Sequence, residues 1–353
     1  MNFASDNGSG ASRKIIDALT ACNTGASPAY GADDHSANAQ KMLAAIFGRG
    51  LAAFLVPTGT ASNALALGAL CPPWGGVFCH EEAHVMEDEC GAPEFFTGGA
   101  KLIGIPGAHG KITPQALKET LTRFPAGLAK QVQPAALSLS QATECGTVYS
   151  RAELGALTET AHDAGLKIHM DGARFANALL SLGCTPAEMT WKAGIDVLSF
   201  GGTKNGAIAC EAVIFFDPAM AADFAYQRKR GGHTLSKGRF LGAQMEAYLG
   251  EHHWLDLARH ANGCAAQFSK ALTALPGVRL AFPTEANEIF PILSARAEAA
   301  LKAAGARYYP WTCRSHGPGE GPREGEALLR LVTSFVTEQA EIDAFVVIVR
   351  GAV

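Results

Sequence analysis

The sequence predicts an α/β fold: a large, mostly parallel sheet domain covered by helices, with a smaller α+β domain at the C-terminal end. Three observations support this prediction. Short apolar runs alternate with helical patterns from about residue 37 to 216, as they do in a parallel sheet with helices on both faces. After about residue 217, long helical patterns come first and short strands follow. Hydrophobic residues make up 48% of the 353 residues, which is enough for a large buried core.

In the first part of the chain, helix and strand signals take turns. Residues 36–47 carry apolar side chains at helical spacing, and Gly48 just beyond them is a C-terminal stop signal, so we expect an amphipathic helix there. Further helical patterns cover 114–124 and 151–164. The expected strands are 53–57, 77–79, 102–105, 135–140, 166–170, 196–200 and 212–216.

The pattern of expected helices and strands in the C-terminal third indicates a second domain. It begins with two long helical patterns, 236–250 and 253–274. We therefore expect residues 1–235 to hold an N-terminal segment and the large domain, and residues 236–353 to hold linking helices and the small domain. The shorter elements expected there are strands at 278–282, 289–293 and 328–333 and helices at 295–304 and 338–349.

Composition excludes several classes of protein. The net charge of −4, with no long run of either sign, argues against nucleic acid or an anionic membrane as the main partner. No apolar run approaches the roughly 20 residues that a membrane span needs. The chain begins without the basic-then-apolar pattern of a secretory signal, and its nine cysteines include no C-x-x-C pair. We expect a cytoplasmic protein with reduced thiols and no metal site.

The segment PTGTASN at residues 57–63 reads as strand, turn and helix. The N–H groups of Gly59, Thr60 and Ala61 at a helix N-terminus, together with two threonine hydroxyls, would form an anion site. Most such turns merely cap a helix, so the segment alone is a weak signal. It matches neither G-x-G-x-x-G nor the P-loop, so the dinucleotide and nucleoside-triphosphate fingerprints are both missing.

Two further segments place charged side chains at strand ends. HMDGAR, residues 169–174, presents Asp171 and Arg174 after an apolar strand, as either a local ion pair or two site residues. SFGGTKNG, residues 199–206, carries Lys204 in a glycine-rich turn after another strand. A lone turn lysine usually faces solvent. If the two strands are neighbours, however, Lys204 lies beside other charges, and partial desolvation makes it a nucleophile for carbonyl groups.

Two single residues are weaker candidates. His84 follows a short strand in EEAHVMEDECGAPE, residues 81–94, where a histidine is more often a capping or core residue than a catalytic one. Glu144, in QATECG, comes at the end of another strand, where a solvated acid is the simpler interpretation.

Taken together, these segments supply what a pyridoxal-phosphate site requires. The phosphate needs N–H and hydroxyl donors, and the aldehyde needs an amine. The pyridine nitrogen needs a carboxylate that keeps it protonated, so that the ring can accept electrons. We therefore expect pyridoxal phosphate as the cofactor.

At this point the motifs match a known family. The sequence resembles the low-specificity L-threonine aldolases, which are pyridoxal-phosphate enzymes of the aspartate-aminotransferase-like fold (fold type I). The likeness runs over nearly the whole chain, and HMDGAR followed by GGTKNG is its most specific part. The other matching segments are SDN at 5–7, AYGADD at 29–34, PTGTASN, AHVMEDECGAPE, QATECG, WKAGIDVLSF before GGTKNG, and RLVTS at 330–334.

The resemblance implies a role for each matching residue. Lys204 would be the Schiff-base lysine, and Asp171 would be the partner of the pyridine nitrogen. Arg174 would lie beside the phenolic oxygen of the cofactor and bind the substrate carboxylate. The remaining implied roles are stacking on the ring for His84, phosphate binding for Gly59, Thr60 and Thr203, a grip on the carboxylate for Ser5 and Arg330, and contact across a dimer interface for Tyr30.

The sequence departs from the family pattern at two places. Where many members read N-T-H-N, this chain has Ala142-Thr143-Glu144-Cys145, so Glu144 replaces a histidine that is discussed as a base or hydroxyl ligand. Where the family has G-G-G-M-R-Q, with an arginine that can reach the phosphate, this chain has GGHTLSKGR at 231–239. Lys237 or Arg239 is the candidate for that contact.

The implied activity is retro-aldol cleavage of L-threonine, L-allo-threonine or related β-hydroxy-α-amino acids such as phenylserine, giving glycine and an aldehyde. His84, Glu144 or a water molecule would take the hydroxyl proton. A homodimer or homotetramer with shared active sites is expected. Within the same cofactor class the alternatives are a β-eliminating lyase or an aminotransferase. A nicotinamide-dependent oxidoreductase is disfavoured by the missing G-x-G-x-x-G, and a non-catalytic binding protein by the presence of the lysine, the acid and the arginine.

Overall fold

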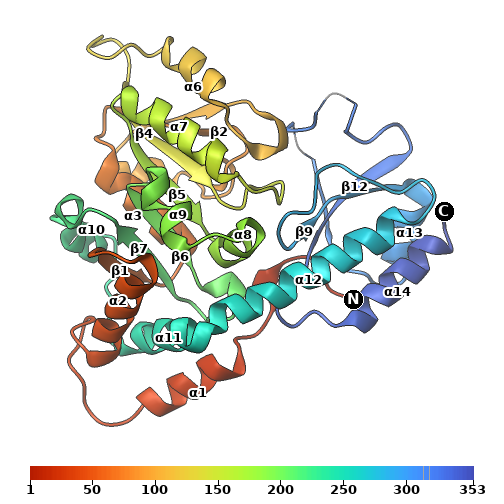
Figure 1. The fold of residues 1–353 in the computed structure, drawn as a ribbon, viewed down its shortest axis with the longest axis horizontal. Coiled ribbons are helices and arrows are strands. Elements are labelled where there is room, and N and C mark those ends of the chain that lie inside the picture. Colours follow the sequence, from red (N-terminus) through yellow and green to blue (C-terminus); the bar gives the residue numbers. More distant parts are fainter. Residues whose placement is uncertain (313, 318) are drawn as a thin grey trace.

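The computed structural model describes residues 1–312, 314–317 and 319–353. Within these ranges the chain forms a seven-stranded sheet with helices on both faces and a five-stranded sheet near its C-terminal end (Figure 1). The predicted fold class, a large and mostly parallel sheet domain with a smaller α+β part after it, is confirmed. In the same ranges no helix is both long and apolar enough to cross a bilayer.

The large sheet has the strand order β1-β7-β6-β5-β4-β2-β3. The strands β3, β2, β4, β5 and β6 pair in parallel, whereas β7 runs antiparallel to both β6 and β1. β2 is buried along its whole length, as expected for a strand between two helical layers. The strands are β1 Ala52–Val56, β2 Gly75–His80, β3 Lys101–Ile105, β4 Gln133–Ser140, β5 Lys167–Gly172, β6 Val197–Gly201 and β7 Glu211–Phe215.

Four strands of this sheet end at the same edge. Ser140 at the end of β4 pairs with Asp171 near the end of β5, and β6 runs parallel beside β5. β1 ends there as well, because Val56 of β1 and Gly201 of β6 both pair with Glu211 of β7. The carboxyl ends of β4, β5, β6 and β1 therefore lie together, which is the usual place for a ligand in an open α/β sheet.

Helices cover the two faces of the sheet in separate layers. One layer consists of α3 Gly59–Leu70, α4 His84–Glu87, α5 Ala92–Thr97 and α10 Phe224–Arg230. The other consists of α1 Arg13–Cys22, α2 Asp34–Phe47, α6 Pro114–Leu121, α7 Arg151–Asp163, α8 Phe175–Leu182, α9 Pro186–Met189 and α11 Arg239–Leu249. Short 3₁₀ helices are η1 Asp6–Gly8, η2 Ala108–Gly110, η3 Trp191–Ala193, η4 Thr203–Asn205, η5 Pro218–Ala221 and η6 Gly250–His252.

The smaller sheet is antiparallel and has the order β11-β12-β10-β8, with β9 also paired to β12. Helices pack on it and form a second apolar core. Its elements are β8 Arg279–Leu280, β9 Glu288–Ile289, β10 Pro291–Ser294, β11 Tyr309–Pro310, β12 Glu326–Val332, α13 Ala295–Ala303 and α14 Gln339–Arg350.

The single strand predicted at 289–293 is divided in the structure into β9 and β10. Both segments pair with β12 in one continuous register. Pro291, the first residue of β10, has no N–H to donate to the ladder, and the hydrogen bonding is interrupted there.

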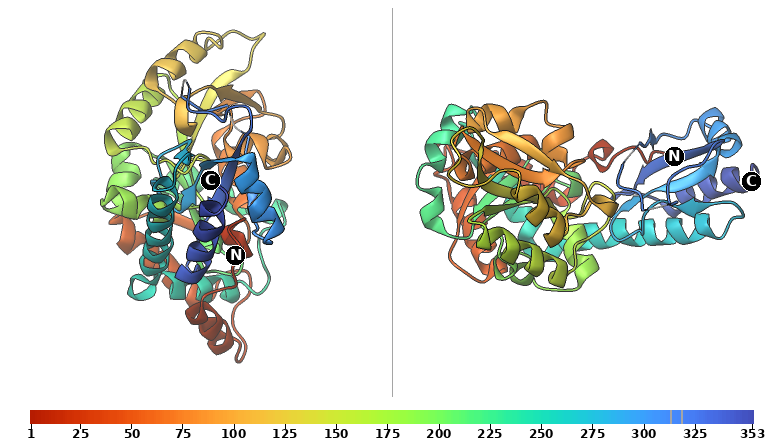
Figure 2. Two further views of the ribbon diagram at one scale, coloured as in Figure 1. Left: turned by 90° about the vertical axis from the view of Figure 1, so that its right-hand side faces the viewer. Right: turned by 90° about the horizontal axis from the view of Figure 1, so that it is seen from above.

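One helix joins the two cores. α12, His253–Thr273, is about 30 Å long and runs from the large domain into the C-terminal region (Figures 1 and 2). Its first turns bury Trp254 and Ala258 in the large core, and its last turns bury Phe268 and Leu272 in the small one. This continuous helix fixes the spacing between the two sheets.

The N-terminal residues also belong to the small core. Phe3 is buried between Phe268 and Phe345. Its N–H donates to Arg307 O and its carbonyl accepts from Val332 N, each at 2.8 Å. The chain then crosses to the large domain, so residues 4–12 run between the two parts. The domain boundary after residue 235 stays a prediction.

Candidate active site

The carboxyl edge of the large sheet opens into a cavity of about 590 Å³. Side chains from the large domain, the N-terminal segment and the small sheet all reach its wall. Ten of the predicted site residues line it: Ser5, Gly59, Thr60, His84, Glu144, Asp171, Arg174, Thr203, Lys204 and Arg330. Segments that are far apart in the sequence are thus brought to one place by the parallel strands.

Lys204 lies in η4, directly after β6, and its ammonium is buried. Burial lowers its pKa, and the positive charge of Arg174 lowers it further. The glycines before it are required by close packing, because a Cβ on Gly201 would lie 2.4 Å from Ala173 O and one on Gly202 would lie 2.6 Å from Cys210 O. A lysine with a lowered pKa more often has the free amine that reacts with a carbonyl group.

The turn that carries Lys204 is held from β7. The Glu211 carboxylate accepts the Gly202 N–H at 2.7 Å and also hydrogen-bonds the Thr203 hydroxyl. Burial raises the pKa of Glu211 to about 7. The Thr203 oxygen also accepts the Cys210 N–H at 3.1 Å, so this hydroxyl, predicted to bind phosphate, already has two partners in the protein.

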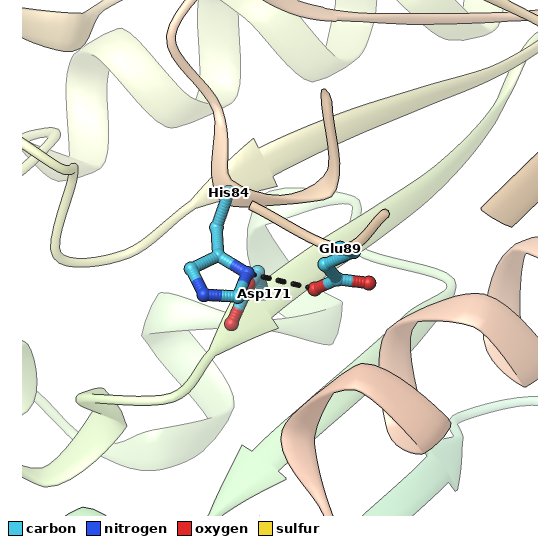
Figure 3. Close-up of side chains that lie close together, drawn as sticks. All are labelled: His84, Glu89 and Asp171. Carbon is cyan, nitrogen blue, oxygen red and sulfur yellow. Dashed lines mark hydrogen bonds and ion pairs between the residues drawn. The ribbon is translucent and has the colours of Figure 1, made fainter. Parts of the chain in front are cut away.

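Asp171 is part of a buried chain of polar groups (Figure 3). Asn63 Nδ2 donates to Asp171 Oδ2 at 2.8 Å and to Glu89 Oε1 at 2.7 Å. Glu89 Oε1 lies 2.9 Å from His84 Nδ1. Burial alone would raise the pKa of Asp171, but the positive charges of His84 and Lys204 hold it below its ordinary value. Asp171 therefore stays ionised at neutral pH.

His84, Glu89 and Asp171 are close enough to resemble a metal site, since one ligand atom of each lies within 4.8 Å of the others (Figure 3). Their polar atoms, however, form hydrogen bonds with one another and with Asn63. The Glu89 oxygen that faces His84 also accepts from Asn63, and Asn63 links it to Asp171. We interpret the cluster as a hydrogen-bond network that fixes the imidazole and the Asp171 carboxylate.

The N-terminus of α3 has the geometry expected of the predicted anion site. Thr58 caps this helix, and its Oγ1 accepts from Ala61 N at 3.1 Å. The N–H groups of Gly59 and Thr60 belong to the first helical turn, where no intrahelical carbonyl can accept them. Both residues line the cavity, so their donors and the positive end of the helix dipole are available to a phosphate.

Two arginines from different domains meet at a buried carboxylate. Arg174 Nε and Nη2 donate to the two oxygens of Asp6 at 2.8 and 3.0 Å. Its Nη1 lies 3.3 Å from Glu288 Oε2. Arg330 donates twice to Glu288 Oε1, at 2.9 and 2.6 Å. Asp6 and Glu288 thus orient the guanidinium of Arg174, and Glu288 orients that of Arg330.

The Arg174–Asp6 pair is expected to contribute strongly to stability. Asp6→Ala should lower the free energy of unfolding by about 3 kcal/mol, because it leaves a buried guanidinium without its bidentate partner. Asp17→Ala is the matched control: its pair with Arg13 is exposed, so less than about 1 kcal/mol should be lost. Urea denaturation of both variants measures the difference. Equal losses of unfolding free energy in the two variants would show that the buried Asp6–Arg174 pair contributes no more than an exposed pair.

Glu144 is partly buried in the cavity wall next to His84, and its Oε2 is a buried atom. Its Oε1 accepts the His84 backbone N–H at 2.8 Å and the Ser140 hydroxyl at 2.6 Å. Its Oε2 has no hydrogen-bond partner among the described residues. Burial raises the pKa of Glu144, and the nearby charge of Asp171 raises it further.

Comparison with known proteins identifies the family of this chain. A family model described as β-eliminating lyase matches residues 2–295. The low specificity L-threonine aldolase of a Pseudomonas species is 43% identical over 341 residues, which are 96% of this chain and 94% of that protein. The protein of the same name from Pseudomonas aeruginosa is 46% identical over 308 residues, or 87% and 88% of the two chains.

The chain belongs to the β-eliminating lyase family. Among solved structures, the Leishmania major threonine aldolase has a TM-score of 0.91 at 29% sequence identity, and the match covers 100% of this chain and 99% of that one. The predicted family, the low-specificity L-threonine aldolases, and the predicted lyase class are confirmed.

The residues of this β-eliminating lyase fit pyridoxal phosphate. Free N–H donors at the start of α3 suit the phosphate, the buried amine of Lys204 suits the aldehyde, and the ionised carboxylate of Asp171 suits the pyridine nitrogen. All three groups line one cavity. The donor set therefore agrees with the cofactor expected for this family.

Two predicted site residues of this family member lie elsewhere. Tyr30 is half exposed, and its N–H donates to Ser236 O at 3.0 Å. Lys237, next to Ser236, is exposed. Neither lines the Lys204 cavity; Tyr30 instead lines a separate hollow with Asp33 and Arg228. Within one chain the structure does not bring these residues to the site.

Several residues that shape the site were not predicted. Asn63, Glu89, Asp6, Glu288 and Glu211 all hold predicted site residues in place. Asn63 and Glu89 lie inside segments already singled out, so those segments contained a signal for them. Glu211 lies between apolar neighbours in its strand, and this is the hint that the sequence offers; Glu288 follows Asn287 and carries no such signal.

Proposed function

We propose that the protein is a pyridoxal-phosphate-dependent aldolase that cleaves L-threonine, L-allo-threonine and related β-hydroxy-α-amino acids to glycine and an aldehyde. The observation that carries this proposal is the meeting of Lys204, Asp171 and two arginines in one buried cavity. When bound, pyridoxal phosphate supplies an electron sink for the pair left on Cα when a bond to Cα breaks.

The residues at the cofactor end of the cavity would bind the charged groups of the cofactor. Gly59 and Thr60 donate N–H groups to the phosphate. Asp171, kept ionised by its positive neighbours, holds a proton on the pyridine nitrogen. His84, held by Glu89 at 2.9 Å, presents its ring to the cavity. Lys204 would hold the cofactor through its aldehyde group, because its amine lines the cavity and has a lowered pKa.

The arginine end sets the direction of the substrate. Arg174 and Arg330 have fixed guanidinium groups in the cavity wall, and Ser5 lies beside them. A carboxylate gripped there fixes rotation about the bond between Cα and the nitrogen. By fixing the orientation of the substrate, this grip would favour Cα–Cβ cleavage over loss of the α-proton.

The test is the release of aldehyde from threonine, allo-threonine and phenylserine by the purified protein with added cofactor. Glycine should appear in equal amount with each aldehyde. Release of ammonia and a 2-oxo acid instead would identify a β-eliminating lyase. Transfer of the amino group to a 2-oxo acid would identify an aminotransferase. Either outcome would refute the aldolase proposal.

We further propose a homodimer or homotetramer in which the surface around Tyr30 and Lys237 completes the cavity of a partner. Both residues are exposed and lie next to one another, away from the cavity of their own chain. Mixing Lys204→Ala chains with Tyr30→Phe chains should restore activity that neither variant has alone, because a hybrid assembly regains one intact site. Sedimentation that shows an active monomer would contradict the shared site.

A further inference from the structure

One buried carboxylate oxygen in the cavity wall has no partner. Besides the exposed Asp88, the carboxylates that line the described wall are Glu144, Asp171 and Glu211. Asp171 accepts from Asn63 and Ala173, and Glu211 accepts from Gly202 and Thr203. Glu144 Oε2 accepts from no described residue, although Oε1 of the same group is held twice. A buried acceptor without a partner is costly unless a ligand supplies one.

The carboxylate is also held in a fixed direction. Ser140 at the end of β4 and the His84 backbone both donate to Oε1, so the group cannot turn freely. The N–H that holds Glu144 belongs to His84, which itself lines the cavity. Glu144 is therefore held in the cavity wall beside His84, with Oε1 fixed by two donors and Oε2 unpartnered among the described residues.

We propose that Glu144 Oε2 is the base that takes the β-hydroxyl proton of the substrate. This inference rests on the proposed aldolase function. The carboxylate accepts the hydroxyl proton, and the O–H electron pair becomes the second bond of the aldehyde carbonyl. The Cα–Cβ bond breaks, and its electron pair remains on Cα, delocalised into the cofactor. Cα then takes one proton and Glu144 releases one to solvent, so threonine becomes glycine and acetaldehyde with no net change in protons.

The surroundings favour this residue over His84. Burial and the charge of Asp171 both raise the pKa of Glu144, which makes the carboxylate a stronger proton acceptor once it is ionised. His84 is disfavoured by its contacts, because its Nδ1 is already paired with Glu89 Oε1 at 2.9 Å. The other titratable groups that face Glu144 are Cys79 and Tyr149, whose own pKa values burial and the Glu144 charge raise.

Glu144→Gln separates the two proton transfers of the reaction. The amide keeps the shape but accepts no proton, so kcat for threonine cleavage should fall about 10²-fold or more. Exchange of the glycine α-proton with D₂O needs no hydroxyl base and should change by less than about threefold. Cofactor absorbance confirms that the site is intact. Glu94→Gln is the control, because Glu94 also has an unpartnered buried oxygen but lies outside the cavity.

Ser140→Ala gives a second measurement, the pH dependence of kcat, which would not change if Glu144 had only a structural role. The Ser140 hydroxyl lowers the pKa of Glu144, so its loss should raise that pKa. The base works only when ionised, and the acid limb of kcat should therefore move to higher pH.

Two results would overturn the assignment: near-normal cleavage by Glu144→Gln, or equal loss of cleavage and glycine exchange. An unmoved acid limb in Ser140→Ala would also count against it. Wild-type protein that exchanges the glycine proton but releases no aldehyde would instead refute the aldolase function itself, and the base with it.

Discussion

Lys204→Ala is expected to abolish the covalent attachment of pyridoxal phosphate and to lower aldolase kcat by at least about 10³-fold, equivalent to about 4 kcal/mol of activation free energy. The side chain is partly buried in η4, just after β6, and its lowered pKa favours a free amine inside the cavity. The phosphate donors at the start of α3 and the Asp171 carboxylate are unchanged, so the cofactor should still bind without the covalent bond. This variant thus separates noncovalent binding of the cofactor from its covalent attachment.

Reduction with borohydride followed by peptide mapping measures the attachment. In the wild type, the pyridoxyl group should be found on Lys204. Lys270→Ala, which changes an exposed lysine of α12, should label and react as the wild type does. A pyridoxyl group on any other lysine, or full activity of Lys204→Ala, would remove Lys204 from the site.

The residues at strand ends could be predicted because the chemistry and the topology agree. Asp171 and Lys204 each follow an apolar run, and parallel strands bring their carboxyl ends to one edge. The alternation of strands and helices is strong in the sequence because the sheet is buried on both faces. The same features made the fold class predictable from residue patterns.

The contacts that orient the site could not be predicted in the same way. Asn63 reaches Asp171 across 108 positions, and Asp6 reaches Arg174 across 168. Both depend on how the N-terminal segment and α3 are placed in three dimensions, which no local pattern encodes. Arg174 and Arg330 carry a family signature, whereas Glu288, which joins them, carries none.

Short helices were missed for a different reason. α1 has a serine at its N-cap and a clear amphipathic pattern, so it could have been predicted from the sequence. α5 has only six residues, too few to show a period. α5 is stabilised by its packing on α3 rather than by its own sequence, because so short a helix is not stable alone.

Asp171→Asn is the second substitution with a large expected effect. It removes the charge that holds the pyridine nitrogen protonated, and the rate of aldehyde release should fall roughly 10²-fold or more. The change also disturbs the local network. Asn63 Nδ2 donates to Asp171 Oδ2, and an amide nitrogen placed there would face another donor. Asn63 Oδ1 has no partner in the structure, so a turn of the Asn63 amide could relieve the clash at the expense of its bond to Glu89.

The measurement is kcat for aldehyde release at a cofactor concentration that saturates the variant, with occupancy followed by absorbance. Asp196→Asn is the matched control. Asp196 precedes β6 at the opposite edge of the same sheet, where it accepts the Ile168 N–H at 2.8 Å, and its loss should affect stability but not kcat. A rate loss in Asp171→Asn alone would assign the charge of Asp171 to the chemistry. Near-normal turnover with cofactor bound would mean that Asp171 only positions Asn63 and its neighbours, and the ring-nitrogen role would have to be given up.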